Sequence, residues 1–198
     1  INKSESKIGA KELPAVTQIF TEHYMVDFLL DNSIGAWYAN KNLKKNKMTN
    51  IKIETNVKKE LGLSNFSLDS LRLNKNDNQE WEPLIKDFIG WPENLSDFKL
   101  LDPCAGSGHF LVAAFNKLVP MRMALENLTA KEACDAVIKE NIYGLEIDKR
   151  CVEIAAFAIA LNAWKYPNAG GFRILPELQI AWCGQSLNMK RDEWIGLC

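Results

Sequence analysis

The sequence reads Leu-Leu-Asp-Pro-Cys-Ala-Gly-Ser-Gly-His-Phe from Leu100 to Phe110, and this pattern is the strongest indication of the fold class. A short apolar run ends at Asp102, a Gly-Ser-Gly turn follows, and apolar spacing predicts a helix from Phe110 to Leu118. Gly106 and Gly108 let the backbone turn sharply and let a ligand approach without a Cβ in the way. The stretch therefore predicts a strand, a tight turn, and a helix N-terminus whose free N–H groups favour an anion.

The same alternation continues toward the C-terminus. We expect a helix over Glu126 to Glu140, a strand over Ile142 to Ile147, a helix over Lys149 to Trp164, and a strand over Leu178 to Trp182. Asp148 is placed to cap the second of these helices. Strands that alternate with helices at this spacing predict an α/β fold with a mostly parallel sheet and right-handed crossovers.

The N-terminal half has a different pattern. Apolar spacing predicts a helix over Pro14 to Tyr38, with Thr21 as its N-cap, followed by an exposed lysine-rich stretch over 39–59. Residues 60–97 carry large apolar side chains that predict short amphipathic helices: Trp81, Leu84, Ile85, Phe88 and Trp91. We therefore expect a helical N-terminal region over 1–97 and the first part of an α/β domain over 98–198.

Composition limits the classes of function. The 198 residues are 47% apolar and 25% charged, with a net charge of −1, and no apolar run is long enough to cross a bilayer. A lysine-rich stretch between Lys41 and Lys59 either meets DNA phosphates or is a solvated face. The five cysteines form no Cys-x-x-Cys pair, so no metal site is expected and reduced thiols in the cytoplasm are the simplest interpretation.

The residues around the glycine turn narrow the choice of ligand. A dinucleotide fingerprint would need a third glycine where Leu111 stands, and no P-loop motif occurs. Asp102 would repel a phosphate but can accept hydrogen bonds from an ammonium group. A ligand that carries both ammonium and carboxylate, such as the methionine end of S-adenosylmethionine, fits the acid and the helix N-terminus together. A bare structural turn is the alternative.

Two further segments follow the next two predicted strands. Glu146 lies at the carboxyl end of its strand, where an acid can chelate a ribose diol; an ordinary strand-end acid is the alternative. Gln185 follows the third strand and either bonds an adenine edge or is a polar turn residue. Trp182 either walls an adenine pocket or belongs to the core.

These segments resemble the cofactor motifs of adenine-N6 DNA methyltransferases of the class found in type IIG restriction-modification enzymes and BREX-type phage-defence methylases. The run from Asp102 to Gly108 resembles the first motif, Gly144 to Asp148 the second, and Cys183 to Leu187 the third, where Gln185 replaces an acid or Asn. Phe20 to Val26 resembles the upstream motif, with Glu22 in place of a proline.

The resemblance implies a Rossmann-like, S-adenosylmethionine-dependent methyltransferase fold, a double-stranded DNA substrate and no membrane. It implies that His109 acts through backbone positioning beside the cofactor. The implied cofactor-binding residues are Phe20, Thr21, Asp102, Pro103, Ala105, Gly106, Ser107, Gly108, His109, Phe110, Glu146, Ile147, Gln185 and Ser186.

The family's catalytic Asn/Asp-Pro-Pro-aromatic tetrapeptide does not occur in the sequence. We therefore expect no catalytic residue in this chain, and expect it to be the inactive cofactor half of a longer protein. Two alternatives stay open: a methyltransferase that acts on RNA or protein, and a degenerate methyltransferase fold that only binds a partner. A nicotinamide dehydrogenase is disfavoured by the glycine pattern.

Overall fold

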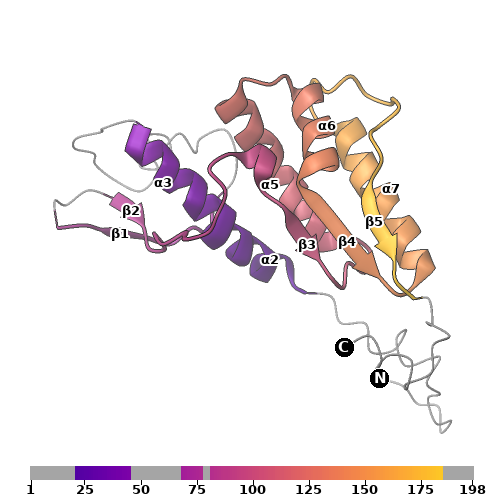
Figure 1. The fold of residues 1–198 in the computed structure, drawn as a ribbon, viewed down its shortest axis with the longest axis horizontal. Coiled ribbons are helices and arrows are strands. Elements are labelled where there is room, and N and C mark those ends of the chain that lie inside the picture. The colour runs from indigo at the N-terminus through magenta and orange to yellow at the C-terminus, as the bar shows by residue number, and fades with distance from the viewer. Residues whose placement is uncertain (1–20, 46–67, 78–80, 185–198) are drawn as a thin grey trace, which may run out of the picture.

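The computed structural model describes residues 21–45, 68–77 and 81–184. Its C-terminal part is an α/β unit with a parallel sheet, as expected from the sequence. The sheet has the order β3–β4–β5, formed by β3 (Leu100–Asp102), β4 (Ile142–Glu146) and β5 (Gln179–Trp182). Three helices connect the strands: α5 (His109–Glu126), α6 (Ala130–Glu140) and α7 (Lys149–Lys165). Figure 1 shows the three strands running side by side in one direction.

Local sequence explains where these helices begin and end. α6 starts at a capping box, in which the Thr129 side chain accepts from the Glu132 N–H and the Glu132 carboxylate accepts from the Thr129 N–H. Asp148 caps α7 by accepting from the Arg150 N–H at 2.9 Å, which confirms its predicted role. α5 runs past its predicted end, through Pro120, to a left-handed Asn127.

The core lies between the helices and one face of the sheet. α5 supplies several fully buried apolar side chains, with Phe115 the largest, and packs against α6 and α7. The opposite face of the sheet is less covered, since Leu101 is 57% exposed and Ala181 is also exposed. Among the described helices, none is long and apolar enough to span a membrane.

The N-terminal helix differs in detail from the prediction. α2 (His23–Leu30) continues through a π-helical turn, η1 (Asp31–Gly35), into α3 (Ala36–Lys45). Residues 14–20 lie outside the described part. The prediction of Thr21 as N-cap is wrong: Glu22 holds that position and makes no side-chain capping bond.

The predicted short helices of the 60–97 segment are wrong for the part that is described. That part contains β1 (Leu73–Lys75) and β2 (Trp81–Pro83), which pair antiparallel, and a single turn of 3-10 helix, η2 (Leu95–Asp97). Pro83 has no N–H to donate and disfavours a helix interior. Phe88, Trp91 and Phe98 instead form a chain of ring contacts, with centroids 5.0 Å and 5.4 Å apart.

The π turn joins the N-terminal helix to the rest of the chain. The Asn32 side chain donates to Ser70 O at 2.8 Å and accepts from the Arg72 N–H at 2.9 Å. These two bonds satisfy backbone groups in the same way as the backbone of a neighbouring strand. Asp31 accepts from the Ser70 N–H at 2.9 Å and pairs with Lys117 of α5 at 2.6 Å. Burial is the largest effect on Asp31 and raises the pKa of its carboxyl group, while Lys117 opposes the rise.

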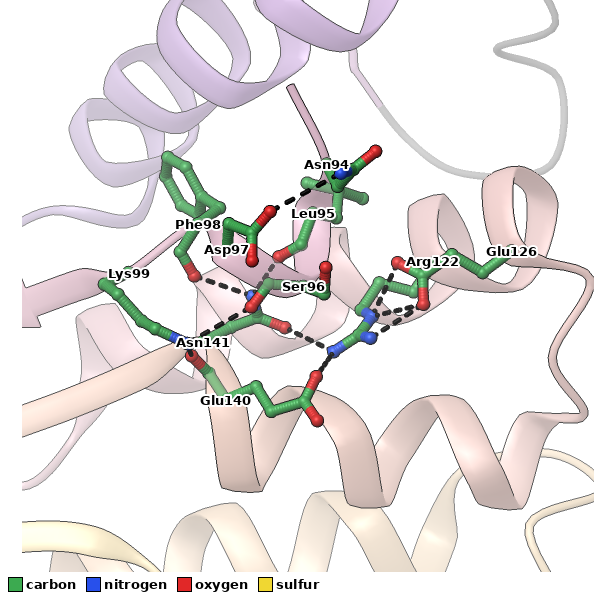
Figure 2. Close-up of polar contacts among 10 residues, drawn as sticks. All are labelled: Asn94, Leu95, Ser96, Asp97, Phe98, Lys99, Arg122, Glu126, Glu140 and Asn141. Atoms are coloured by element: carbon green, nitrogen blue, oxygen red, sulfur yellow. Dashed lines mark hydrogen bonds and ion pairs between the residues drawn. The ribbon is translucent and has the colours of Figure 1, made fainter. Parts of the chain in front are cut away.

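A second polar cluster, shown in Figure 2, lies where the strands begin. The fully buried Asn141 donates to Leu95 O at 2.7 Å and to Phe98 O at 2.8 Å, and its Oδ1 accepts from Arg122 at 3.2 Å. Arg122 is itself buried and pairs with Glu126 and Glu140. Asn141 thereby ties the segment before β3 to the residue just before β4.

Replacing Asn141 by Leu should reduce stability by about 2–4 kcal/mol, because two buried carbonyls and the Arg122 guanidinium lose a partner. Urea denaturation would measure the loss. The matched control is Asn116→Leu, at an exposed position of α5, where we expect a change within about 0.5 kcal/mol. Equal losses for the two variants would contradict this account of Asn141.

Lys117→Met should cost roughly 3 kcal/mol at neutral pH, because it leaves the Asp31 carboxylate buried without its cation. The raised pKa means that folded Asp31 binds a proton more readily than unfolded Asp31, so its contribution to stability improves as the pH falls. The loss measured by denaturation should therefore shrink from pH 7 toward about pH 5. With Asp31→Asn in the background the Lys117→Met effect should not depend on pH; a similar pH dependence in that background would contradict the assignment.

Candidate ligand site at the carboxyl edge of the sheet

Acidic residues end the first two strands at the same edge of the sheet. Asp102 is the last residue of β3 and pairs in register with Gly144, while Glu146 is the last residue of β4 and pairs with Trp182. Carboxyl ends of parallel strands form the usual ligand crevice of open α/β sheets. The predicted convergence of Asp102 and Glu146 on one edge is present in the structure.

The glycine turn between β3 and α5 has the geometry that only glycine adopts readily. Gly106 and Gly108 have φ values of 52° and 82°. The Ala105 N–H donates to Leu145 O at 2.9 Å, and the Cys104 N–H donates to the Asp102 carboxylate at 3.1 Å. The start of the turn is therefore fixed both to β4 and to the last residue of its own strand.

Space as well as backbone conformation requires Gly108. A Cβ on this residue would lie 2.8 Å from the Cβ and 2.9 Å from the Cα of Ala155 on α7. Gly144 of β4 is less tightly constrained, because its Cβ would lie 2.9 Å from the end of the Leu111 side chain and 3.2 Å from Ala105 Cβ. Sequence reasoning missed the fitting of Gly144 against α5, although a glycine inside a strand is a recognised sign of close approach.

Glu146 connects the glycine turn after β3 with the segment that follows β4. Its carboxylate accepts from the N–H groups of Gly106 at 2.7 Å, Ile147 at 2.8 Å and Asp148 at 2.9 Å. The sequence predicted that Glu146 chelates a ribose diol; in the structure its carboxylate also holds the glycine turn against the end of β4. A carboxylate has about four acceptor positions, so most of its capacity is already used.

Apolar surface lies beside these acids. Ile147 is 63% exposed and Trp182 is 43% exposed, and the Trp182 indole N–H donates to Ile147 O at 2.8 Å. The Cys183 N–H bonds Glu146 O at 2.9 Å, so the segments after β4 and β5 run together. An exposed flat ring next to a carboxylate suits a nucleoside, because Trp and Ile can contact a base while the acid meets hydroxyl groups.

The start of α2 also lies at this edge. The rings of His23 and His109 meet edge to face with centroids 4.1 Å apart. The His109 Nε2 atom is buried and has no hydrogen-bond partner in the described part of the chain. No sequence signal indicated this contact, which joins two positions far apart in the chain.

The remaining predicted site residues divide into two groups. Thr21 is exposed just before α2, and Pro103, Ser107 and Phe110 lie in or beside the turn. Phe20, Gln185 and Ser186 lie outside the described residues, so their predicted contacts stay predictions.

Comparison with known proteins shows the family of the chain. The family model of the MmeI DNA-methyltransferase domain matches residues 75–194. The chain belongs to this family. The match includes the glycine turn and all three strands of the parallel sheet, whereas the start of α2 lies outside it.

Curated relatives extend the comparison. The adenine-specific methyltransferase PglX of Lacticaseibacillus casei is 25% identical over 80% of this chain, and the adenine-specific methyltransferase BrxX of Escherichia coli is 27% identical over 81% of it. A putative type II restriction enzyme and methyltransferase of Methanocaldococcus jannaschii is 31% identical over 62% of this chain. The chain spans about 12% of the length of the PglX and BrxX relatives and 11% of the third. It is thus similar to one limited part of adenine-specific methyltransferases.

Gly108→Ala should destabilise the protein by about 2–4 kcal/mol, because it adds a collision with Ala155 to the cost of an unfavourable φ. The matched control is Gly90→Ala. Gly90 has the nearly identical φ of 81°, but a Cβ added there would meet nothing within 4 Å, so only the conformational cost of about 1 kcal/mol remains. Chemical denaturation of both variants would separate the two effects, and equal losses would show that the contact with α7 contributes nothing.

Proposed function

We propose that this chain is the S-adenosylmethionine-binding portion of a site-specific DNA adenine-N6 methyltransferase with a Rossmann-like fold, acting in restriction-modification or phage defence. The observation that carries the proposal is the edge of the sheet, where a glycine turn, a helix N-terminus and two strand-end carboxylates lie together. The family match and the adenine-specific methyltransferases among its relatives support the same reaction.

The residues present fit the chemistry of this cofactor. Asp102 supplies an acceptor for the ammonium group, and the N-terminus of α5 favours the carboxylate. Gly106 carries no Cβ that could obstruct a ligand, whereas the space beside Gly108 is already taken by Ala155 of α7. Ile147 and Trp182 offer exposed apolar surface for the adenine, and Gln185 would contact its edge. When bound, the cofactor supplies an electrophilic methyl group.

The bonds of Glu146 indicate how the ribose would enter. Two hydroxyl donors cannot be added to a carboxylate that already accepts three N–H groups without exceeding its capacity. We propose that the hydroxyls replace the Gly106 N–H at this carboxylate, while the Ile147 and Asp148 bonds keep its orientation. Binding would then free the glycine turn to adjust around the ligand.

The proposed role in the larger reaction is binding rather than chemistry. By resemblance, a flipped adenine is held by an Asn/Asp-Pro-Pro-aromatic tetrapeptide, which this sequence lacks. We propose that the 198 residues alone bind cofactor and transfer no methyl group, and that double-stranded DNA is the substrate of the longer protein of which they form part. The division into an N-terminal region over 1–97, whose described residues form the β1–β2 pair as well as helices, and a methyltransferase portion over 98–198 belongs to the same proposal.

Asp102→Asn and Glu146→Gln should each weaken the binding of S-adenosylhomocysteine by roughly 10- to 150-fold, because each removes a charge-assisted hydrogen bond to the ligand. Isothermal titration calorimetry would measure the affinities, after circular dichroism has shown that the variants are folded. The matched control is Glu177→Gln, an exposed acid before β5 begins and so at the other end of the strand, where we expect unchanged binding.

Two outcomes would count against the proposal. Binding that neither variant weakens would place the ligand elsewhere. A folded wild-type chain that binds neither S-adenosylmethionine nor S-adenosylhomocysteine would favour a degenerate module that only binds a partner.

A further inference from the structure

We propose that the imidazole of His109 donates a hydrogen bond to the carboxylate of the ligand's amino-acid end, and that His23 is the residue that positions this ring. The inference rests on the function proposed above and assigns a role to a side chain that the sequence motif explains only through its backbone. It also gives the first residue of α2 a part in ligand recognition.

The direction of the His109 side chain follows from its place in the helix. His109 is the first residue of α5 and directly follows the left-handed Gly108. Side chains of α-helices lean toward the helix N-terminus, so the imidazole is directed toward the glycine turn and not along α5. Asp102 and the free N–H groups of the helix are at the same edge.

The state of the ring nitrogen indicates a missing partner. His109 Nε2 is buried, and no hydrogen-bond partner for it exists among the described residues. Buried polar atoms in native proteins are nearly always paired with protein, water or ligand. His109 Nε2 thus has one unused hydrogen-bonding position in the first turn of α5, the helix that follows the glycine turn.

His23 restricts the orientation of this ring. The two imidazoles meet at 4.1 Å with 75° between their planes. α2 is in turn fixed on α5, because Lys117 pairs with Asp31 at 2.6 Å and with Asp27 at 3.2 Å. His23 therefore belongs to a helix that cannot easily move away from α5.

The chemistry of the surroundings selects the ligand group. A neutral imidazole can donate one N–H, and the N-terminus of α5 favours a negative charge nearby. The amino-acid end of the ligand carries a negative carboxylate, which can accept from His109. It also carries an ammonium group, which can donate to Asp102. His109 would thus distinguish a nucleoside that carries an amino acid from one that does not.

The test compares two ligands that differ in this group. S-adenosylhomocysteine carries the amino-acid end, and methylthioadenosine keeps the adenine, ribose and sulfur without it. His109→Phe retains a ring against His23 but has no nitrogen. In the 198-residue chain, calorimetry should show affinity for S-adenosylhomocysteine reduced roughly tenfold or more, with affinity for methylthioadenosine changed by less than about twofold.

Two further variants separate recognition from packing. His109→Gln offers an amide N–H near the position of the ring nitrogen and should recover part of the affinity for S-adenosylhomocysteine. His23→Phe keeps a ring contact and should bind nearly as well as wild type, whereas His23→Ala should weaken S-adenosylhomocysteine selectively.

Nitrogen NMR supplies a readout that a packing role would not change. The sequence contains only two histidines, so the imidazole signals can be assigned by comparing the His23 and His109 variants with wild type. The Nε2 signal of His109 should shift on addition of S-adenosylhomocysteine and stay in place with methylthioadenosine.

The outcomes distinguish this inference from the proposed function. If His109→Phe weakens both ligands equally, weakens neither, or leaves the NMR signal unmoved, the role of His109 is overturned while cofactor binding stands. If the folded wild-type chain binds neither ligand, the proposed function fails and this inference fails with it.

Discussion

The hydrogen bonds of Asn141 set the relation between the first two parallel strands, and the candidate site depends on that relation. Its amide holds the carbonyls of Leu95 and Phe98, while its backbone carbonyl accepts from the Leu100 N–H at 2.7 Å. The strand register of Leu100 with Ile142 follows directly. If β3 shifted by one residue relative to β4, the side chains of β3 would move to the opposite face of the sheet, and Asp102 would no longer lie beside Glu146.

The site and this polar cluster therefore lie at opposite ends of the same short strands. β3 has three residues and β4 has five, so the distance between the two ends is small and little freedom remains between them. The glycine turn then gains its own restraint from Glu146 and from the Leu145 carbonyl. The Asn141 cluster thus restrains the beginning of the strands, and the Glu146 carboxylate and the Leu145 carbonyl restrain the turn at the ligand edge.

Sequence alone predicted the C-terminal half well because its signals are local. The paired glycines, the Asp148 cap and the apolar helix from Lys149 all act within a few residues, and the strands they separate were located to within about two residues. The predictions for the N-terminal half were wrong where a residue's hydrogen-bond partners lie far away in the sequence. The π turn depends on Asp31 and Asn32 reaching Ser70 and Arg72, and the β1–β2 pair replaced helices that the spacing of aromatic residues had favoured. In the site, position at the sheet edge was predictable, but the bonds of Glu146 and the His23–His109 contact depend on side-chain arrangement across elements.

The close approach of Gly108 and Ala155 has a consequence for how the sequence can vary. The two residues share one gap between the turn and α7, and that gap has no room for an additional methyl group. A larger side chain at residue 155 would collide with the backbone of Gly108. Both positions should therefore be restricted to small residues during evolution. A library that varies α7 should therefore retain a small residue at position 155, which is buried against the turn.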